Sequence, residues 1–302
     1  MGPMYRSLSG GREHFQHGPI DLIIEAEGPP DLVAQVHAQA RARFDDVLRT
    51  LAGELTVLRR PIDPGQSNPF LGPVATQMWL ACRHFASDGF ITPMAAVAGS
   101  VAQHMLVPYQ VPGIVRAWVN NGGDIALHLT EGSQLRLGLF SDLKRLPWFE
   151  AAGSGIEIEL DGVATIRADT GVGGVATSGW AGRSCSFGIA DSVTVLASTA
   201  SLADAAATIL ANAVDIDDDS IARQPACELW DDSDLGDRLV TVGVPPLPAA
   251  KVAIALESGR AKAQAWVDEG LLESVVLVCQ GQAVSASRCR RAVKEKELCH
   301  HL

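Results

Sequence analysis

The segment from Gly174 to Val214 constrains the fold of this chain more than any other part of the sequence. It joins a glycine-rich polar turn, a short β-branched run and an alanine-rich stretch. The run Ser192 to Ala197 predicts a buried strand, because β-branched side chains pack well on a pleated surface. A helix is expected to open at Ser201 and to carry Asp204 and Thr208 on one face, since residues four apart are neighbours. Turn, strand and helix together predict one unit that presents polar groups to a ligand.

The polar groups of this segment indicate a phosphate site, with one alternative left open. The turn carries Thr177, Ser178, Gly179 and Arg183, all able to face an anion. A carboxylate and a hydroxyl one helical turn apart beside such a turn suggest magnesium binding. Ser201-x-x-Asp204 also matches a capping box, in which the same carboxylate would cap its own helix. The sequence does not decide between metal ligand and cap.

Charge and hydropathy exclude several classes of partner. The 302 residues carry a formal net charge of -11 at pH 7, whereas nucleic acids and acidic membranes attract clustered Lys and Arg. No apolar run reaches the ~18 residues that span a bilayer. The first residues lack the hydrophobic core of a secretory signal, and the cysteines form no C-x-x-C pair. We expect a cytoplasmic protein with reduced thiols and without nucleic-acid or membrane partners.

Apolar spacing along the chain predicts helices and strands that do not alternate strictly. Helices are expected at residues 31–51, 74–85, 92–105, from 201 onward and at 249–269. Strands are expected at residues 20–27, 115–119, 124–129, 134–140, 155–160, 163–168, 192–197 and 274–279, with irregular chain at 60–73 and 225–248. This order indicates an α+β fold, with mixed or antiparallel sheets packed with helices. We expect one domain over residues 1–284 and a disordered polar tail over 285–302.

Two further patterns are explained by packing and turn chemistry alone. Small residues crowd the stretch Ala95 to Ser100, which predicts tight packing of the helix that contains it. The sequence Asn120 to Asp124 (NNGGD) carries the residues of a tight β-hairpin turn. Neither pattern requires a ligand when it is taken by itself.

Three well-known motifs are matched only in part. Gly171-x-Gly173-x-x-Ala176 matches a dinucleotide fingerprint, but no helix follows it to hold a pyrophosphate. The acidic stretch 215–220 begins like a calcium loop but lacks its glycine and its bidentate glutamate. Cys185 has a neighbouring cation but no identified His partner, and no G-x-S-x-G elbow occurs. Rossmann, EF-hand and simple hydrolase interpretations are therefore rejected.

The ordered motifs NNGGD, TSG and ADAAAT resemble those of the ApbE superfamily of flavin-handling proteins, over roughly residues 91–214. In that family the first two turns line a flavin dinucleotide site, and the helix supplies magnesium ligands. The resemblance implies magnesium bound by Asp204, Thr208 and a backbone carbonyl near Ala98. It also implies that FAD or a related flavin or nucleotide is bound by Asn121, Gly122, Gly123, Asp124, Thr177, Ser178, Gly179 and Arg183.

The chain departs from the FMN-transferring members of that family at two places. Gly99-Ser100 stands where they carry Lys-Gly, and residues 180–188 replace their His and Asp-Pro-x-x-Gly segment. We therefore expect the fold to carry over and leave two functions open for a protein that binds a small phosphorylated ligand. One is magnesium-dependent phosphoryl or nucleotidyl transfer of the FMN type, to an acceptor that the sequence does not identify. The other is non-catalytic ligand binding or a scaffold role, and a homodimer is compatible with both.

Overall fold

The computed structural model describes residues 2–139, 162–182 and 184–288. The strands are β1 (Met4–Ser7), β2 (Glu13–His17), β3 (Ile20–Glu27), β4 (Arg116–Asn121), β5 (Asp124–Leu129), β6 (Gln134–Leu139), β7 (Gly162–Arg167), β8 (Gly174–Ser178), β9 (Ser192–Ala197), β10 (Ala222–Pro225), β11 (Leu239–Gly243), β12 (Ser274–Cys279) and β13 (Gln282–Ser287). The helices are α1 (Pro30–Phe44), α2 (Val47–Leu58), α3 (Pro73–Arg83), α4 (Val97–Leu106), α5 (Ala200–Ala213), α6 (Ala226–Leu229) and α7 (Ala249–Asp268), with short 3-10 turns at η1 (Ser9–Gly11), η2 (Pro93–Ala96), η3 (Val107–Tyr109) and η5 (Ala168–Thr170).

Nine of these strands form one sheet, in the order β1-β2-β3-β4-β5-β8-β9-β12-β13. Every neighbouring pair in it is antiparallel. The pairs β6–β7 and β10–β11 make two further antiparallel sheets of two strands each. The predicted α+β class, with antiparallel sheets packed with helices, is confirmed.

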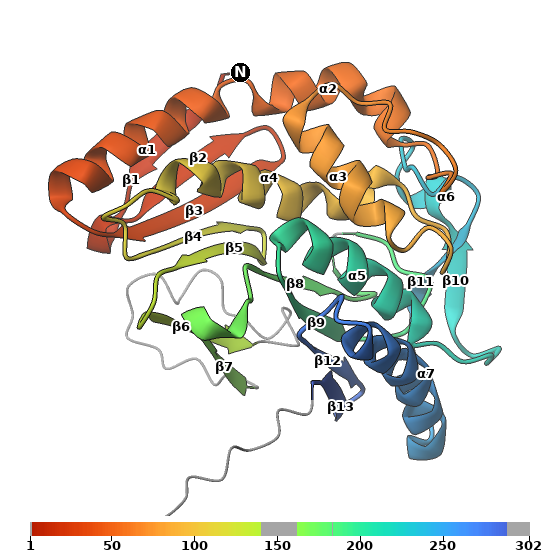
Figure 1. Ribbon diagram of the computed structural model, residues 1–302. Coiled ribbons are helices and arrows are strands. Elements are labelled where there is room, and N and C mark those ends of the chain that lie inside the picture. Colours follow the sequence, from red (N-terminus) through yellow and green to blue (C-terminus); the bar gives the residue numbers. More distant parts are fainter. Residues whose placement is uncertain (1, 140–161, 183, 289–302) are drawn as a thin grey trace, which may run out of the picture.

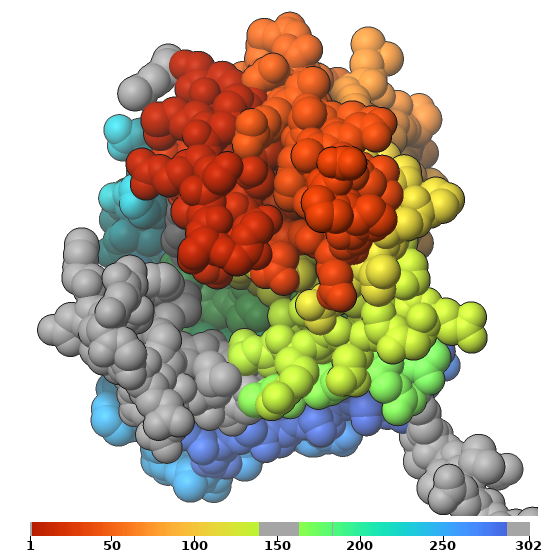
Figure 2. Space-filling view, turned by 90° about the vertical axis from the view of Figure 1, so that its left-hand side faces the viewer, coloured from red at the N-terminus to blue at the C-terminus, as the bar shows by residue number. Residues whose placement is uncertain are grey.

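The long helices lie on one side of the large sheet (Figure 1). Helices α1 and α4 contact the first half of the sheet, α5 lies on β8 and β9, and α7 lies on β12 and β13. Seen from the side, the N-terminal residues form the upper part of the molecule and the strands that follow lie beneath them (Figure 2). Within the described ranges, no helix is both long and apolar enough to cross a membrane.

Helices and sheet enclose two hydrophobic clusters of different character. The cluster under α1 to α4 contains large side chains such as Phe15, Phe44 and Met78, all fully buried. The cluster around α5 is rich in alanine, including the fully buried Ala203 and Ala207. An alanine helix presents little side-chain bulk, so neighbouring backbones can approach it closely.

Two glycines, one in α4 and one in β8, mark where backbones closely approach the first turn of α5. A Cβ placed on Gly99 of α4 would lie 2.3 Å from the carbonyl oxygen of Ala200, and one on Gly174 would lie 2.1 Å from the amide nitrogen of Ala200. Real side chains do not tolerate such distances, so both positions require glycine. The tight packing predicted from the small residues 95–100 is confirmed, and it joins α4 and β8 to the first turn of α5.

Several predicted boundaries are wrong. The strand predicted at residues 20–27 is confirmed as β3, but it is not the first, because the unpredicted strands β1 and β2 precede it and pair with it as a meander. The helix predicted over residues 31–51 is two helices, α1 and α2, separated at Asp45 and Asp46. The stretch 225–248, expected to be irregular, contains α6 and β11. Strands β1 and β2 are short and mostly polar, so tertiary pairing rather than local apolar spacing decides their structure.

The structure of the segment from Gly174 to Val214 also differs from the predicted one. Residues Gly174 to Ser178, expected as a turn, form strand β8, which pairs between β5 and β9. The helix predicted over residues 92–105 is the 3-10 turn η2 followed by α4, with a break at Ala96. Strand β13 extends to Ser287, three residues into the predicted tail. The predicted strand 155–160 and the rest of the tail lie outside the described residues.

We predict that Gly99→Ala destabilises the protein by about 1–3 kcal/mol, the usual cost of forcing a methyl group into a packed contact. The added Cβ would overlap the backbone of Ala200 and the Cβ of Asp204, which lies 2.8 Å from its position. Urea unfolding monitored by circular dichroism measures the change in the free energy of unfolding.

Gly53→Ala in α2 is the matched control. Nothing lies within 4 Å of a Cβ at Gly53, so alanine should stabilise that exposed helix by about 0.5–1 kcal/mol. A Gly99→Ala protein as stable as the wild type would show that α4 and α5 do not need this close approach.

Candidate ligand and metal site

The first turns of α4 and α5 hold each other through side-chain contacts. The amide N–H of Gly99 donates to Oδ2 of Asp204 at 2.8 Å. In return, the amide N–H of Ala200 donates to Oε1 of Gln103 at 2.9 Å. The first four N–H groups of a helix have no partner within the helix, so each helix here satisfies a donor of the other. Asp204 is therefore fixed against the backbone of α4.

The capping-box alternative for Asp204 is wrong. Helix α5 begins at Ala200, and the hydroxyl of Thr199 caps it by accepting the N–H of Leu202 at 3.2 Å. Asp204 lies further along the helix and accepts from Gly99 of α4 instead. The N-cap is therefore Thr199, which immediately precedes the helix, and not Ser201.

Thr208 lies one turn after Asp204 and reaches the same junction. Its hydroxyl donates to the carbonyl oxygen of Ala95 at 3.5 Å, beside the break between η2 and α4. The carbonyl of Ala98 accepts from Nδ2 of Asn121 at 3.1 Å. As a residue of the first turn of α4, Ala98 is also placed to accept the helical N–H of Ala102.

The NNGGD hairpin is brought to this junction by β4 and β5. Gly122 and Gly123 form its two-residue turn with φ of 67° and 115°, which favour glycine. The N–H of Gly123 donates to the side chain of Asn120 at 2.8 Å. Asn121 is buried and contacts α4, whereas Asp124 faces the next strand of the sheet. The hairpin interpretation of this motif is correct, and its polar residues still converge on the junction.

The TSG residues lie at the end of β8, next to the hairpin. The N–H of Thr177 donates to Oδ1 of Asp124 at 3.2 Å, and its hydroxyl lies 2.9 Å from that of Thr194. Ser178 pairs with Val193 in the sheet. Gly179 admits no side chain, since a Cβ would lie 2.2 Å from the carbonyl oxygen of Asp191. Arg183, also predicted for this site, lies outside the described residues.

The electrostatics of the junction are dominated by two partly buried carboxyl groups. Burial raises the pKa of Asp124 to about 7, although the N–H of Thr177 counteracts it. Burial, followed by the charge of Asp124, raises the pKa of Asp204 well above its usual range. The N–H groups of Gly99 and Ala98 lower it in part. Because burial opposes the charged form of both groups and Asp124 further opposes that of Asp204, the two carboxylates are suited to a cation.

The donor set fits a hard divalent cation. Magnesium prefers oxygen ligands, usually one or two carboxylates with substrate phosphates and water. Asp204, the hydroxyl of Thr208 and a carbonyl at the η2–α4 break are all oxygen donors within one junction. The described residues offer no site for a soft metal, because they contain no cluster of three or more His, Cys, Asp or Glu side chains.

Asp234 is a neighbouring carboxylate that the sequence did not reveal. It accepts a hydrogen bond of 2.5 Å from the hydroxyl of Thr92, which also caps η2. Asp204 and Asp234 both add to the burial that raises the pKa of Cys82. Burial, with Asp234, also raises the pKa of Cys185, so this thiol is a poor nucleophile, as expected. Asp234 sits in a stretch predicted to be irregular, and no motif in the printed sequence points to it.

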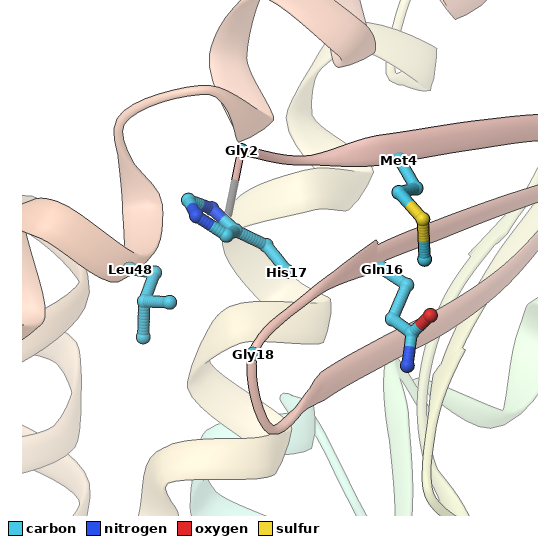
Figure 3. Close-up of a pocket in the computed structure, with 6 residues that line it drawn as sticks. All are labelled: Gly2, Met4, Gln16, His17, Gly18 and Leu48. Carbon is cyan, nitrogen blue, oxygen red and sulfur yellow. The ribbon is translucent and has the colours of Figure 1, made fainter.

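Two surface hollows lie away from this junction. One of about 400 Å³ is bordered by Met4, His17 and Leu48, with the ring of His17 beside Leu48 (Figure 3). Another of about 460 Å³ lies between α1 and β2 and includes His37 and Arg41. Neither includes a residue of the α4–α5 junction. Contacts between motifs, not a surface hollow, therefore define the candidate site.

Comparison with known proteins identifies the family. The sequence model of the family described as "AbpE bacteria" matches residues 5–285. The chain therefore belongs to this family, and the ApbE-like resemblance predicted from the motifs is confirmed. The structure of apo flavinyl transferase ApbE from Pseudomonas stutzeri is similar at 13% identity and a TM-score of 0.47, covering 95% of each chain.

Curated relatives that match part of the chain are named UPF0280 proteins. The protein of Methanothermobacter thermautotrophicus is 39% identical over 163 residues, 53% of this chain and 56% of its own length. That of Methanosphaerula palustris is 34% identical over 203 residues, covering 67% of this chain and 77% of its own length. The chain matches about half the length of several of these relatives.

We predict that, in EDTA, the free energy of unfolding falls as the pH rises from about 5 to 7.5. A carboxyl group with a raised pKa stays protonated in the folded protein and ionises in the unfolded chain, so its contribution is present near pH 4 and lost towards pH 7. Asp204→Asn should reduce this fall and be at least as stable as the wild type at pH 7.5. Urea unfolding of both proteins at several pH values measures the change in the free energy of unfolding.

The asparagine oxygen can still accept the N–H of Gly99, so the contact between α4 and α5 is retained. Asp46→Asn is the control, because Asp46 is exposed and pairs with Arg49 at the surface. If Asp204→Asn is less stable than the wild type at pH 7.5, the charge of Asp204 is needed for folding and the account of a costly carboxylate pair is wrong.

Proposed function

We propose that this protein binds a phosphorylated flavin or related nucleotide, together with magnesium, where α4, α5, the β4–β5 hairpin and β8 meet. The proposal includes magnesium-dependent transfer of a phosphoryl or nucleotidyl group of the FMN type to an acceptor protein. Membership in the family supports a flavin-related role. The observation that carries the proposal is the pair Asp124 and Asp204, two partly buried carboxylates with raised pKa values at a junction of polar motifs.

Each motif has a distinct part in this proposal. Asp204 and Thr208 would bind magnesium, with the carbonyl of Ala95 or of Ala98 as a further ligand. Magnesium, when bound, would offset the charge of the ligand's phosphates. Thr177, Ser178 and the nearby N–H groups would hold phosphate oxygens. Gly122 and Gly123 carry no side chains, so the flavin ring or ribose could lie against their backbone.

Residues that position these groups need not contact the ligand. Asp124 holds the end of β8 through the N–H of Thr177. Asn121 links the hairpin to α4 through the carbonyl of Ala98. In phosphoryl transfer the protein mainly orients the reactants and stabilises charge, so such supports determine how well the groups are placed.

One observation favours the second candidate, a binding protein without transfer activity. FMN-transferring members of the ApbE superfamily carry Lys where this chain has Gly99. Here a side chain at that position would overlap the backbone of Ala200, because its Cβ would lie 2.3 Å from the carbonyl oxygen. The packing of α4 on α5 therefore leaves no room for such a lysine. Ligand binding does not depend on it, so this candidate keeps the same site.

We predict that FAD raises the melting temperature of the wild type in the presence of magnesium and much less in EDTA. A ligand at 100 times its Kd stabilises the folded state by about 2.7 kcal/mol. Asp204→Asn and Thr208→Val should each weaken the magnesium-dependent binding of FAD about tenfold or more, since each removes an oxygen ligand. Differential scanning fluorimetry and flavin fluorescence measure the binding.

AMP release from FAD, followed by chromatography, separates the two candidates. Magnesium-dependent release supports transfer, whereas saturable binding without release supports a binding protein. Asp46→Asn is again the surface control and should bind FAD like the wild type. Equal FAD binding by the wild type and Asp204→Asn, with and without magnesium, would contradict the assignment of this site.

A further inference from the structure

A hairpin arm is attached beside the candidate site. This arm, residues 222–243, contains β10, α6 and β11. Its residue Asp234 accepts a hydrogen bond from Thr92, immediately before η2. The N–H of Thr241 donates to the carbonyl of Ser186 at 2.8 Å, and its hydroxyl donates to the carbonyl of Phe187 at 3.3 Å. The arm is thereby fixed both to η2 and to the segment that follows TSG.

Arg238 of this arm is held over an aromatic ring. Its guanidinium carbon lies 3.6 Å from the centre of the ring of Phe90, within the range of a cation–π contact. Phe90 is in turn supported by Phe187, whose ring centre is 6.3 Å away in an edge-to-face arrangement. A guanidinium stacked in this way keeps its N–H groups in its own plane, where they remain able to bind an anion.

The guanidinium of Arg238 makes no ion pair with the described acidic residues, and the side chain is exposed. Two other charged residues of the arm are paired, Arg223 with Asp215 and Asp232 with Arg59. A cation fixed on an aromatic ring but left without a counter-charge is suited to an anionic ligand.

Arg238 lies close to the α4–α5 junction along a short path of contacts. Phe90 is two residues before Thr92, which begins η2, and η2 contains the carbonyl contacted by Thr208. Burial, followed by the charges of Asp204 of the junction and Asp234 of the arm, raises the pKa of the Cys82 thiol, so both carboxylates lie near it. The described side chains of the junction itself are acidic or neutral. A cation from a neighbouring element would therefore add to the charge that magnesium supplies to a phosphorylated ligand there.

We propose that Arg238 binds a phosphate group of the ligand and that the β10–β11 arm forms the wall of the site on that side. This inference rests on the proposed function, because it assigns one contact of the same ligand. Phe90 holds the guanidinium in place, and Asp234 anchors the arm through Thr92. The ligand class that these contacts favour is a flavin or nucleotide phosphate ester rather than the unphosphorylated compound.

FMN and riboflavin distinguish this contact, because they differ only by the phosphate. The wild type should bind FMN more tightly than riboflavin in fluorescence titrations with magnesium. Arg238→Met, which keeps the length of the side chain but not its charge, should weaken FMN binding about tenfold or more and leave riboflavin binding unchanged. Arg238→Lys should recover part of the preference, since it restores a charge without the planar fork.

Arg260→Met is the matched control, because Arg260 lies on α7 and pairs with Glu257 on the same helix. It should retain the wild-type preference. If Arg238→Met prefers FMN as strongly as the wild type does, or if the wild type has no preference, Arg238 does not bind the phosphate. Failure of the wild type to bind any flavin, FAD included, would overturn the proposed function itself and this contact with it.

Discussion

The mutual capping of α4 and α5 is the interaction on which the candidate site depends. Each helix begins with amide groups that have no partner inside the helix, and each receives one acceptor from the other, Asp204 for Gly99 and Gln103 for Ala200. The exchange is possible because Gly99 and the alanines of α5 let the two backbones come together. It places a carboxylate where the NNGGD hairpin and the end of β8 also converge.

That placement has an electrostatic cost in the protein without a cation. Asp204 and Asp124 are both partly buried, and burial opposes the charged form of each. The N–H groups of Gly99, Ala98 and Thr177 offset part of this cost but supply no positive charge. A divalent cation would make the charged forms favourable. We propose that the same contacts that stabilise the helix junction prepare a site for metal and phosphate.

The sequence predicted the components of this site better than their connections. Periodicity identified the strand 192–197 and the face shared by Asp204 and Thr208, and motif order identified the family. The role of Asp204 was not decidable, because the sequence alone does not distinguish a carboxylate that caps its own helix from one that accepts a hydrogen bond from a residue 105 positions away. Asp234 and Arg238 were missed for the same reason. Their positions come from pairing of β10 with β11, and nothing local marks that pairing.

The central claim is that Asp204 and Thr208 bind a divalent cation at the break before α4. The most direct test is a crystal grown with Mn²⁺, a hard cation of similar ligand preference to Mg²⁺, and analysed by anomalous scattering. The account predicts one strong anomalous peak in contact with Asp204, Thr208 and a backbone carbonyl of Ala95 or Ala98. A junction that keeps the contact from Gly99 to Asp204 but shows no peak at saturating Mn²⁺ would contradict it, and Asp204 would then serve only to join the two helices.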